Sequence, residues 1–303
     1  MGSKRGRNVR GILLLDKPSG LTSNQALQRA KRLFKAAKAG HTGSLDPLAT
    51  GMLPICFGAA TKLAGYLLDA RKTYFVTAKL GVATDTGDAD GEVIATSDAP
   101  APSEADVRAA VESFVGEIEQ TPPMYSALKR DGKRLYELAR KGIVVDREPR
   151  RVQIDAMTLE GFAWPELSFS VTCSKGTYVR TLVTDLAENL GTVGHVTALR
   201  RLAVEPFDPA DMAGFEQLER DAAEGGLAAL DRHLLPAERA LAGWPRLELP
   251  PQTTERLLHG QSVPAAADWP VGPVRLVDRR MGFVGIGEVL PERRLAPRRM
   301  LLG

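Results

Sequence analysis

Three observations predict an α+β protein of two domains. The chain has 303 residues, enough to bury a large core and to form roughly two domains. Up to about Ala242, segments with the alternating pattern of strands are interspersed with segments of helical periodicity. From about Trp244 the composition changes, and short apolar runs are broken by glycine and proline. The last part therefore indicates a small terminal β domain.

The chain begins with a strand and a helix. Gly11 to Leu15 is a compact apolar run that ends at a turn containing Pro18 and Gly20. Thr22 and Ser23 offer N-cap oxygens for a helix that we expect to run to about Ala37. One face of this helix is apolar, and the remaining surface is basic. The apolar face holds Leu27, Ala30, Phe34 and Ala37.

A strong strand signal lies at Lys72 to Leu80, after a short helix expected at Ala59 to Leu68. Tyr74, Val76, Ala78 and Leu80 alternate with other residues and would share one side. The following stretch, Thr86 to Gly91, resembles a calcium-binding EF-hand loop but fails at both ends. Thr86 would be the first ligand and Ser97 the twelfth, where a bidentate glutamate is required. We expect a hairpin turn leading into a strand at Glu92 to Thr96.

The remaining elements follow from capping and periodicity. Ser103 and Asp106 form a capping-box pattern before a helix whose buried face carries Val107, Ala110, Val111 and Phe114. Pro209 to Ala242 is helical in character without clear element limits. Further elements are expected at Leu135 to Arg140 (helix), Val152 to Glu160 and Leu167 to Cys173 (strands), Tyr178 to Leu190 (helix closed by Gly191), Gly194 to Leu202 (strand), and Val274 to Val277, Gly282 to Leu290 and a final run to Leu302 (strands).

Charge is unevenly distributed along the chain, although the formal net charge is only +3. The stretch from Asp85 to Gln120 has many carboxylates and one basic side chain, Arg108. Such segregation is typical of a nucleic-acid-binding face, and the alternative is scattered solvated charge. Basic residues gather at Lys4 to Arg10, Arg29 to Lys38, Lys129 to Arg151 and Arg293 to Arg299.

Several chemistries are disfavoured by the motifs. Cys56 and Cys173 are far apart, which argues against a disulfide framework or a zinc site. The four histidines lack metal-ligand spacing, and no phosphate loop or dinucleotide fingerprint is present. Ser126 and Lys129 match the S-x-x-K pattern of acyl-transferring serine enzymes, but the accompanying S-D-N element is missing. We expect no metal and no cofactor.

The basic N-terminus is followed by only five clearly apolar residues before Asp16. Such a run is too short for a signal peptide or a membrane span. Together with the two unpaired cysteines, it predicts a cytoplasmic protein.

The segment from Gly40 to Gly51 carries the most chemical information. Its three glycines and one proline favour a shaped loop over a helix or strand. Asp46 stands among apolar neighbours, and Pro47 keeps it out of the helical region. From local pattern alone, a turn in which Asp46 bonds its own backbone is the simpler interpretation.

This segment also resembles a signature of the TruB family of tRNA pseudouridine synthases. Similar patterns occur in the family's order across most of the first 205 residues, and so long an ordered match favours a functional role for Asp46. The matching segments are Leu14–Pro18, Gly40–Cys56, Thr61–Lys62, Lys72–Tyr74, Thr84–Thr86, Pro123–Lys129, Cys173–Tyr178 and Leu199–Leu202.

The resemblance implies a pseudouridine-55 synthase that isomerises a uridine of the tRNA T loop. Asp46 is then the essential carboxylate, which could attack C1′, add to C6 or remove a proton from C2′. Arg180 matches the cation that keeps this acid ionised. Tyr74 matches the residue that stacks on the flipped base, Tyr178 and Leu199 line its pocket, and His41 fills the gap left in the RNA. Lys17 and Lys62 are weaker candidates for contacting phosphate or bracing the loop.

The resemblance further implies a catalytic domain at residues 1–243 with a mixed, largely antiparallel sheet, and a PUA-like RNA-binding domain at residues 244–303. An insertion at about residues 121–151, with Tyr125 and Tyr136, would clamp the T arm. The expected partner is tRNA, with no membrane and no obligatory protein partner. Two alternatives stay open: a guide-dependent pseudouridine synthase, and a non-catalytic RNA-binding or folding module.

Overall fold

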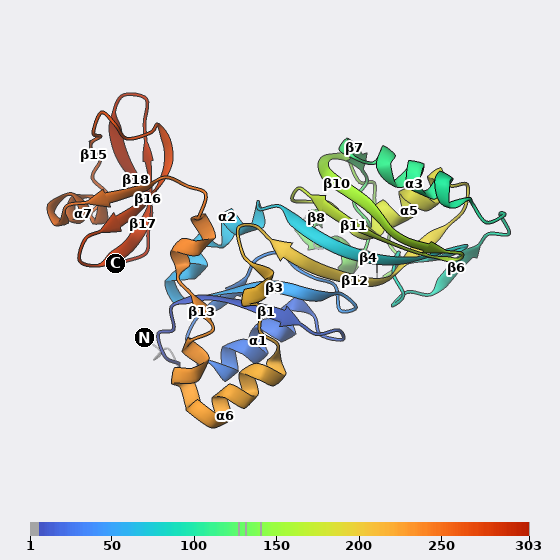
Figure 1. Ribbon diagram of the computed structural model, residues 1–303, viewed down its shortest axis with the longest axis horizontal. Coiled ribbons are helices and arrows are strands. Elements are labelled where there is room, and N and C mark those ends of the chain that lie inside the picture. The colour runs from blue at the N-terminus through green and yellow to red at the C-terminus, as the bar shows by residue number, and fades with distance from the viewer. Residues whose placement is uncertain (1–5, 127, 131, 140, 303) are drawn as a thin grey trace.

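The computed structural model describes residues 6–126, 128–130, 132–139 and 141–302. Lys4 and Arg5 of the first basic segment lie outside the described residues, as do Ala127, Asp131 and Arg140 of the expected clamp. The side chains of Lys129, Arg130, Lys133 and Arg134 are not described either. Figure 1 shows a long sheet with helices at both of its ends and a separate C-terminal β domain.

A nine-stranded sheet forms the main body, in the order β13-β1-β3-β12-β4-β11-β10-β7, with β2 paired to β3. Only β3 and β12 run parallel among these pairs, which confirms the predicted mixed, largely antiparallel sheet. The strands are β1 (Gly11–Lys17), β2 (Ala39–His41), β3 (Thr50–Phe57), β4 (Lys72–Leu80), β7 (Gly116–Gln120), β10 (Arg150–Ala163), β11 (Glu166–Cys173), β12 (Gly194–Val204) and β13 (Leu234–Leu235).

The burial of the strands explains their sequence patterns. In β4, residues on one side are buried from Lys72 to Leu80, and those between them are partly or fully exposed, as the alternation predicts. In β1, Leu13 and Leu15 face one apolar cluster while Ile12 and Leu14 face another. A strand that is buried on both faces has consecutive apolar residues in its sequence, which is why this segment shows no alternation.

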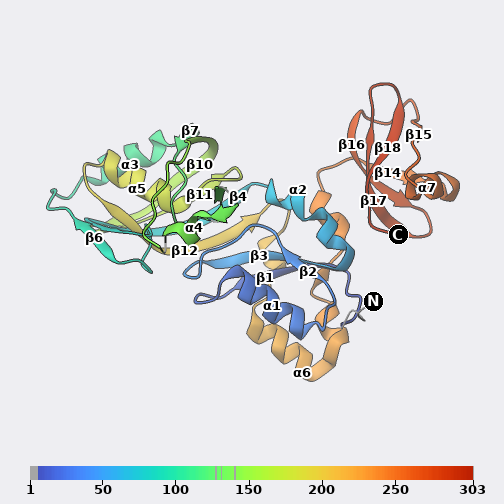
Figure 2. The same cartoon turned by 180° about the vertical axis from the view of Figure 1, so that it is seen from behind.

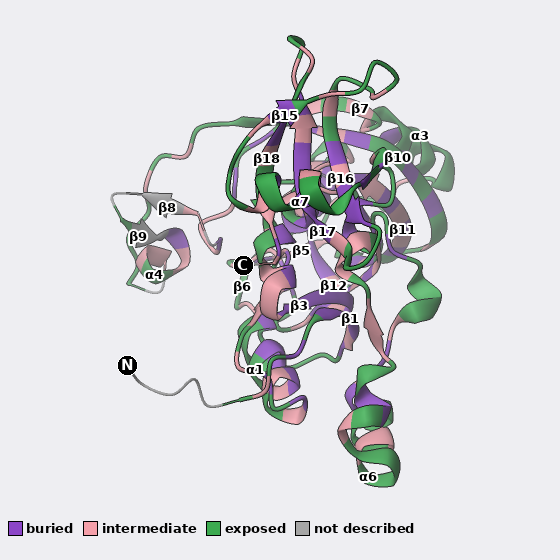
Figure 3. Ribbon diagram, turned by 90° about the vertical axis from the view of Figure 1, so that its left-hand side faces the viewer, coloured by how far each residue is buried: buried purple, intermediate pink, exposed green. Residues whose placement is uncertain are grey.

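Helices cover one face of the sheet in two groups. The helices α1 (Ser23–Leu33) and α6 (Phe215–Asp231) lie together at the β1–β3 end (Figure 1). The helices α3 (Glu104–Ser113) and α5 (Val179–Asn189) lie at the β10–β11 end. All four pack into one apolar cluster with the strands. The outer side of α6 is exposed, whereas β1, β3 and β12 are buried (Figure 3).

Helix α1 ends four residues before the predicted position at Ala37. Lys35 adopts a left-handed conformation with φ of +51°, and the amides of Lys35 and Ala36 close the last turn onto Arg32 and Lys31. This is the hydrogen-bond pattern of a Schellman motif, in which glycine usually occupies the left-handed position. The sequence has lysine there, so the usual stop signal is missing.

The segment that had no clear limits contains three short elements and one kinked helix. Helix α6 is interrupted at Gly226, whose φ of +61° is not helical. The other pieces are the 3-10 helices η2 (Pro209–Asp211) and η3 (Ala237–Leu241) and the strand β13. Elsewhere, the expected helix at residues 59–68 divides into η1 (Gly58–Leu63) and α2 (Ala64–Leu68), and β5 (Val82–Thr84) and β6 (Val93–Thr96) form the expected hairpin.

The expected clamp insertion contains a two-stranded hairpin and a short helix. These are β8 (Lys129–Arg130), β9 (Lys133–Arg134) and α4 (Leu135–Ala139). Tyr125 precedes them, and its hydroxyl donates a hydrogen bond to the Asp85 carboxylate at 3.1 Å. The insertion therefore starts against the acidic turn between β5 and β6.

The C-terminal β domain is a five-stranded sheet in the order β14-β16-β17-β18-β15, seen from both sides in Figures 1 and 2. Leu301 and Ile286 of this domain share an apolar cluster with Leu63 and Leu67 of the main body. Within the described residues, no helix is both long and apolar enough to cross a membrane. The elements are β14 (Arg246–Leu249), α7 (Pro251–Leu258), β15 (Val263–Pro264), β16 (Gly272–Asp278), β17 (Gly282–Val289) and β18 (Arg294–Met300).

Candidate active site

Asp46 lies in an irregular loop that connects β2 to β3. The Asp46 main-chain carbonyl accepts a hydrogen bond from the Ala49 amide at 3.1 Å, so the main chain forms a local turn here. The Asp46 side chain, however, leaves that turn and pairs with Arg180. The Arg180 Nε lies 3.0 Å from Asp46 Oδ2. The structure thus joins two predicted residues that are far apart in the sequence.

Neighbouring elements brace the backbone of this loop on both sides of Asp46. The Ser23 hydroxyl donates to the Leu45 carbonyl at 3.0 Å and accepts from the Leu45 amide at 2.7 Å. The Pro47 carbonyl accepts from the Gly20 amide at 2.9 Å and from Lys17 Nζ at 3.3 Å. Because the residues before and after Asp46 are both fixed, the carboxylate has little freedom to change its position.

Ser23 was a candidate helix cap, and Lys17 was a candidate for contacting phosphate or bracing the loop. The structure gives each of them a single role at the loop. Thr22 alone caps α1, in a capping box with Gln25. Ser23 is buried and turned toward Leu45 instead. Lys17 is fully buried, and its ammonium group also donates to the carbonyls of Pro18 and Leu21. It therefore braces the loop and is not available to a phosphate.

Arg180 is the centre of the charged network. Its guanidinium donates to the carbonyls of Thr86 and Tyr125, at 2.8 and 2.7 Å, and lies 3.4 Å from the Asp88 carboxylate. The Arg180 side chain is 8% exposed, whereas that of Asp46 is 41% exposed. A buried cation held by three other groups thus faces a carboxylate that remains open to a substrate.

The pKa of Asp46 is raised, first because burial disfavours its anion. Arg180 is the main opposing influence and lowers this pKa, with a smaller contribution from Lys17. The carboxylates of Asp88 and Asp90 raise the pKa further. The Asp46 anion is therefore less strongly hydrated and more basic than an ordinary surface aspartate, which suits a nucleophile or a base.

Two predicted pocket residues lie within the electrostatic reach of Asp46. Tyr74 is buried in β4 opposite Val171 and Arg201, and Tyr178 is the N-cap residue of α5. Burial is the main cause that raises the pKa of each phenol, and the Asp46 carboxylate raises both as well. Leu199 on β12 belongs to the same apolar cluster as Tyr74 and Leu45.

His41 ends β2, directly before the loop, and is half-buried. Burial lowers the pKa of its imidazole, and the Arg201 charge lowers it further, so the ring is neutral at pH 7. Its Nδ1 is buried without a hydrogen-bond partner among the residues that the structure describes. Lys62 lies elsewhere: its Nζ donates to the Met300 carbonyl of the C-terminal domain at 2.8 Å.

Four residues contribute to the site in ways that the sequence did not predict. Asp88 was assigned to a hairpin turn, yet this turn supplies the second carboxylate on Arg180. Gln120 holds the Tyr178 backbone with both its amide oxygen and its amide nitrogen, at 3.0 and 3.3 Å. Ser23 and Arg201 bond loop carbonyls. Contacts between a side chain and a distant backbone group leave no motif in the sequence.

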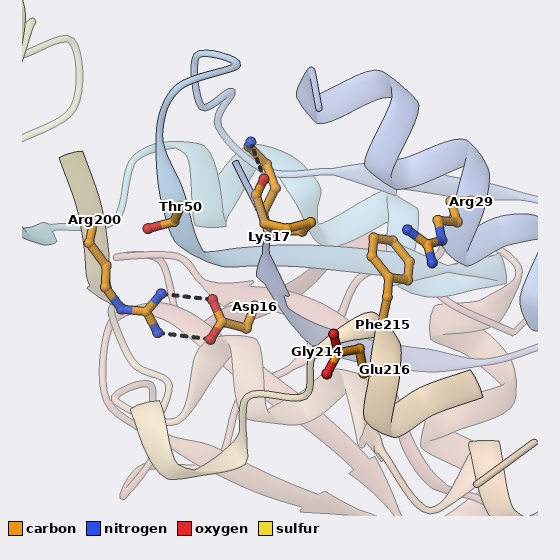
Figure 4. Close-up of a pocket in the computed structure, with 9 residues that line it drawn as sticks. Asp16, Lys17, Arg29, Thr50, Arg200, Gly214, Phe215 and Glu216 are labelled. Carbon is orange, nitrogen blue, oxygen red and sulfur yellow. Dashed lines mark hydrogen bonds and ion pairs between the residues drawn. The ribbon is translucent and has the colours of Figure 1, made fainter. Parts of the chain in front are cut away.

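A hollow of about 420 Å³ adjoins the base of the loop (Figure 4). Arg200 meets Asp16 there through two hydrogen bonds of 2.9 and 2.8 Å, and Arg29 lies over the Phe215 ring. Lys17 and Thr50 line it, whereas Asp46 is not among the lining residues described. Within the described chain, no group of three or more His, Cys, Asp or Glu side chains could hold a metal ion.

Comparison with known proteins supports a single family. The TruB family pseudouridylate synthase N-terminal domain matches residues 31–179, and the tRNA pseudouridylate synthase B C-terminal domain matches residues 180–242. A third domain, the pseudouridine synthase II TruB C-terminal domain, matches residues 245–301. The three matches together span nearly the whole chain from residue 31 onward.

The chain is also similar over nearly its whole length to proteins described as tRNA pseudouridine synthase B. A tRNA pseudouridine synthase B from Pseudomonas aeruginosa is 52% identical over 295 residues, which are 97% of each chain. One from Pseudomonas putida is 51% identical over 97% of this chain and 96% of its own.

Among solved structures, the fold resembles one chain of a Cbf5-Nop10-Gar1 complex, with a TM-score of 0.71. The two chains are 24% identical, and the match covers 92% of this chain and 78% of that chain. It also resembles a chain of an H/ACA RNP bound to a substrate RNA, with a TM-score of 0.73 and 20% identity over 100% and 92% of the two chains. At these identities the structures show a shared fold. The family matches and the identity to the Pseudomonas proteins show more: this chain belongs to the TruB family of pseudouridine synthases.

Proposed function

We propose that this protein isomerises uridine 55 in the T loop of tRNA to pseudouridine, with Asp46 as the essential carboxylate. The observation that carries the proposal is the Asp46–Arg180 ion pair, held in a braced loop in a chain of the TruB family. The tRNA pseudouridine synthase B proteins of Pseudomonas supply the substrate class.

The reaction conserves all atoms and needs no redox partner. The bond between N1 and C1′ breaks, a bond between C5 and C1′ forms, and the proton of C5 is replaced by one on N1. Asp46 can take part by attacking C1′, by adding to C6 or by removing a proton from C2′. Each route requires the anion, which Arg180 stabilises against the cost of burial.

The target uridine must leave the stack of the T loop before it can reach Asp46. We assign Tyr74 to stacking on the extruded base, and Tyr178 and Leu199 to the walls of its pocket. The neutral imidazole of His41 is assigned to the space that the base vacates, because an uncharged flat ring can stack between neighbouring bases without desolvating a charge.

Other parts of the chain would hold the rest of the tRNA. We assign T-arm contacts to the basic insertion at about residues 121–151 and RNA binding to a PUA-like domain at residues 244–303, with a catalytic domain at residues 1–243. Phosphate contacts of this kind position an RNA without reading its sequence. Modification of tRNA would place the protein in the cytoplasm, with no obligatory protein partner.

The direct test is Asp46→Asn, which keeps the size of the side chain and removes its charge. We expect pseudouridine formation in an unmodified tRNA transcript to fall by roughly 10⁴-fold or more, with tRNA affinity retained. Asp69→Asn is a matched control, because Asp69 is an exposed aspartate that pairs with Lys175 away from the loop. Full activity of Asp46→Asn would contradict the assignment.

The same assay separates the alternatives. The purified chain should modify position 55 with no guide RNA and no other protein added, which a guide-dependent enzyme cannot do. Binding without any pseudouridine in the product would instead indicate a non-catalytic RNA-binding module. Mapping the modified position by sequencing checks the specificity for uridine 55.

A further inference from the structure

Arg201 is a fully buried cation directly beneath the Asp46 loop. Its side chain is 1% exposed, and its Nε donates to the Met52 carbonyl at 2.6 Å. A second nitrogen of the guanidinium donates to the Gly43 carbonyl at 3.1 Å. Gly43 lies just after β2, and Met52 lies just after the start of β3. One side chain thus connects the beginning of the loop to its end.

The backbone of Arg201 also contacts this end of the loop. Arg201 pairs with Gly51 where β12 runs parallel to β3. A Cβ atom on Gly51 would lie 2.2 Å from the Arg201 carbonyl oxygen, and the φ of Gly51 is +96°. No other residue type fits this close approach without strain. The register between the loop and β12 is therefore fixed at Arg201 by both its main chain and its side chain.

The electrostatic surroundings of Arg201 argue against a role in stability alone. The described hydrogen-bond partners of the Arg201 guanidinium are neutral groups, and its charge lowers the pKa values of Lys17, Lys72 and His41. A buried cation next to other cations is unfavourable, and an apolar side chain of similar volume is often at least as stable in such a place. What only arginine supplies here is a rigid set of donors that reaches two separated carbonyls.

Arg201 lies next to the substrate pocket as well as the loop. It pairs with Tyr74 across β12 and β4, and its charge lowers the pKa of the Tyr74 phenol, against the larger effect of burial. Arg200, the preceding residue, points the other way and pairs with Asp16 at the hollow in Figure 4. The two consecutive arginine side chains thus have separate environments, and of the two only the Arg201 side chain bonds carbonyls at the ends of the loop.

From this geometry we propose that Arg201 is a positioning residue for the isomerisation: it ties both ends of the Asp46 loop to β12 and so holds Asp46 in register with Arg180 and Tyr74. The proposal rests on the proposed function. Release of either tie lets the loop shift relative to β12, and a displacement of about 1 Å at a reacting group can lower a rate by about 10²-fold. Substrate binding by the rest of the tRNA surface would be unaffected.

Two substitutions distinguish the effect of losing the hydrogen-bond donors of Arg201 from the effect of losing its side-chain volume. Arg201→Lys keeps a cation but can reach only one carbonyl, and Arg201→Met keeps an unbranched chain with no donor. We expect the single-turnover rate to fall by about 10-fold for Arg201→Lys and about 100-fold for Arg201→Met. The Kd for tRNA should remain within about 3-fold of the wild-type value, because the changed contacts are internal.

The same two substitutions at Arg200 are matched controls on the same strand. They remove an ion pair that is partly exposed, so we expect stability to decrease slightly and the single-turnover rate to stay within about 3-fold of wild type. Amide hydrogen exchange gives an independent readout of the loop. Exchange should accelerate at Leu45, whose amide bonds the Ser23 hydroxyl, and at Ala49, whose amide bonds the Asp46 carbonyl, in the Arg201 variants and not in the Arg200 variants.

The outcomes distinguish this proposal from the proposed function. A wild-type protein that forms no pseudouridine contradicts the proposed function itself. An active wild type with equal rates for the Arg201 and Arg200 variants overturns the positioning role, and so does a loss that appears in Kd instead of the rate. If neither Arg201 variant folds, Arg201 is a residue of global stability and the proposal is also overturned.

Discussion

At the scale of single residues, the proposed role of Asp46 requires a partly desolvated carboxylate to stay ionised. Burial raises the pKa of Asp46, and Arg180 acts against this increase. The positive charge of Arg180 is in turn compensated by the carboxylate of Asp88, whose side chain is only 5% exposed. The arrangement is a compromise, because Asp88 holds the arginine in place and at the same time raises the pKa of the acid that the arginine serves.

This electrostatic balance predicts a shift of the pH profile in Asp90→Asn. Asp90 is exposed and raises the pKa of Asp46 without bonding Arg180. An acid that works as an anion loses activity as the pH falls through its pKa. Removal of the Asp90 charge lowers this pKa, so the acid limb of the rate profile should move to lower pH while the plateau at neutral pH stays unchanged.

The measurement is the single-turnover rate of pseudouridine formation between about pH 4.5 and 8. Asp98→Asn is the control, because Asp98 is an exposed aspartate of the same acidic segment and does not act on the pKa of Asp46. A shift of the Asp90→Asn limb toward higher pH would show that Asp46 is not the group that titrates.

The sequence predicted some of these residues and could not predict others. Asp46, Arg180 and Tyr74 were found because their motifs resemble a family, and the ion pair between the first two agrees with that expectation. Ser23 and Asp88 were visible but were assigned to a helix cap and a hairpin turn, which are the commonest local roles of their residue types. Only the tertiary fold brings Ser23 to the loop and Asp88 to Arg180.

At the scale of elements, α1 has two functions at its N-terminus. Thr22 caps the helix through its capping box with Gln25, and the next residue, Ser23, bonds the loop at Leu45. The capping hydroxyls predicted the start of α1, and periodicity predicted the full extent of β4. It placed the end of α1 too late, because a left-handed lysine takes the position where glycine would have marked the stop.

The two adjacent hydroxyls of α1 allow a paired prediction. Ser23→Ala leaves the Leu45 amide and carbonyl unpaired in a buried place, which should cost about 1–3 kcal/mol of unfolding free energy. It should also lower the single-turnover rate by roughly 10-fold, because Leu45 precedes Asp46 and a small displacement is costly in rate. Thr22→Ala removes the helix cap, at about 1 kcal/mol, and should leave the rate unchanged.

Urea unfolding and the pseudouridine assay on both variants check this difference. Both substitutions lower the unfolding free energy, so the decisive comparison is between their single-turnover rates for a similar loss of stability. If Thr22→Ala slows the reaction as much as Ser23→Ala does, the loss follows from destabilisation of α1. The hydrogen bonds to Leu45 would then have no separate role in placing Asp46.

At the scale of the whole molecule, the strand order determines which residues meet. Strand β12 lies between β3 and β4, so Arg201 reaches both the Asp46 loop and Tyr74. Sequence patterns identified β4 and β12 but missed β3, and they carried no information on the neighbours of any strand in the sheet, because register and order arise from long-range pairing. The change of composition near Trp244 did locate a C-terminal β domain, whose five-stranded sheet forms a separate layer.

The contact between the C-terminal domain and the main body predicts how the molecule unfolds. Leu301 and Ile286 pack with Leu63 and Leu67, the Tyr66 and Trp244 rings meet at 5.2 Å, and Lys62 bonds the Met300 carbonyl. Such a shared apolar cluster couples the stability of both parts. We therefore expect a single calorimetric transition for the wild-type protein.

Leu301→Ala tests this coupling. It removes apolar contacts from the shared cluster at a cost of about 2–5 kcal/mol, so the C-terminal sheet should unfold in a separate transition at lower temperature. Leu295→Ala is the matched control, because Leu295 is buried in the core of the C-terminal sheet itself. That variant should lower the Tm and keep one transition, since the shared cluster is intact. Two well-separated transitions already in the wild type would show that the shared cluster does not couple the two parts.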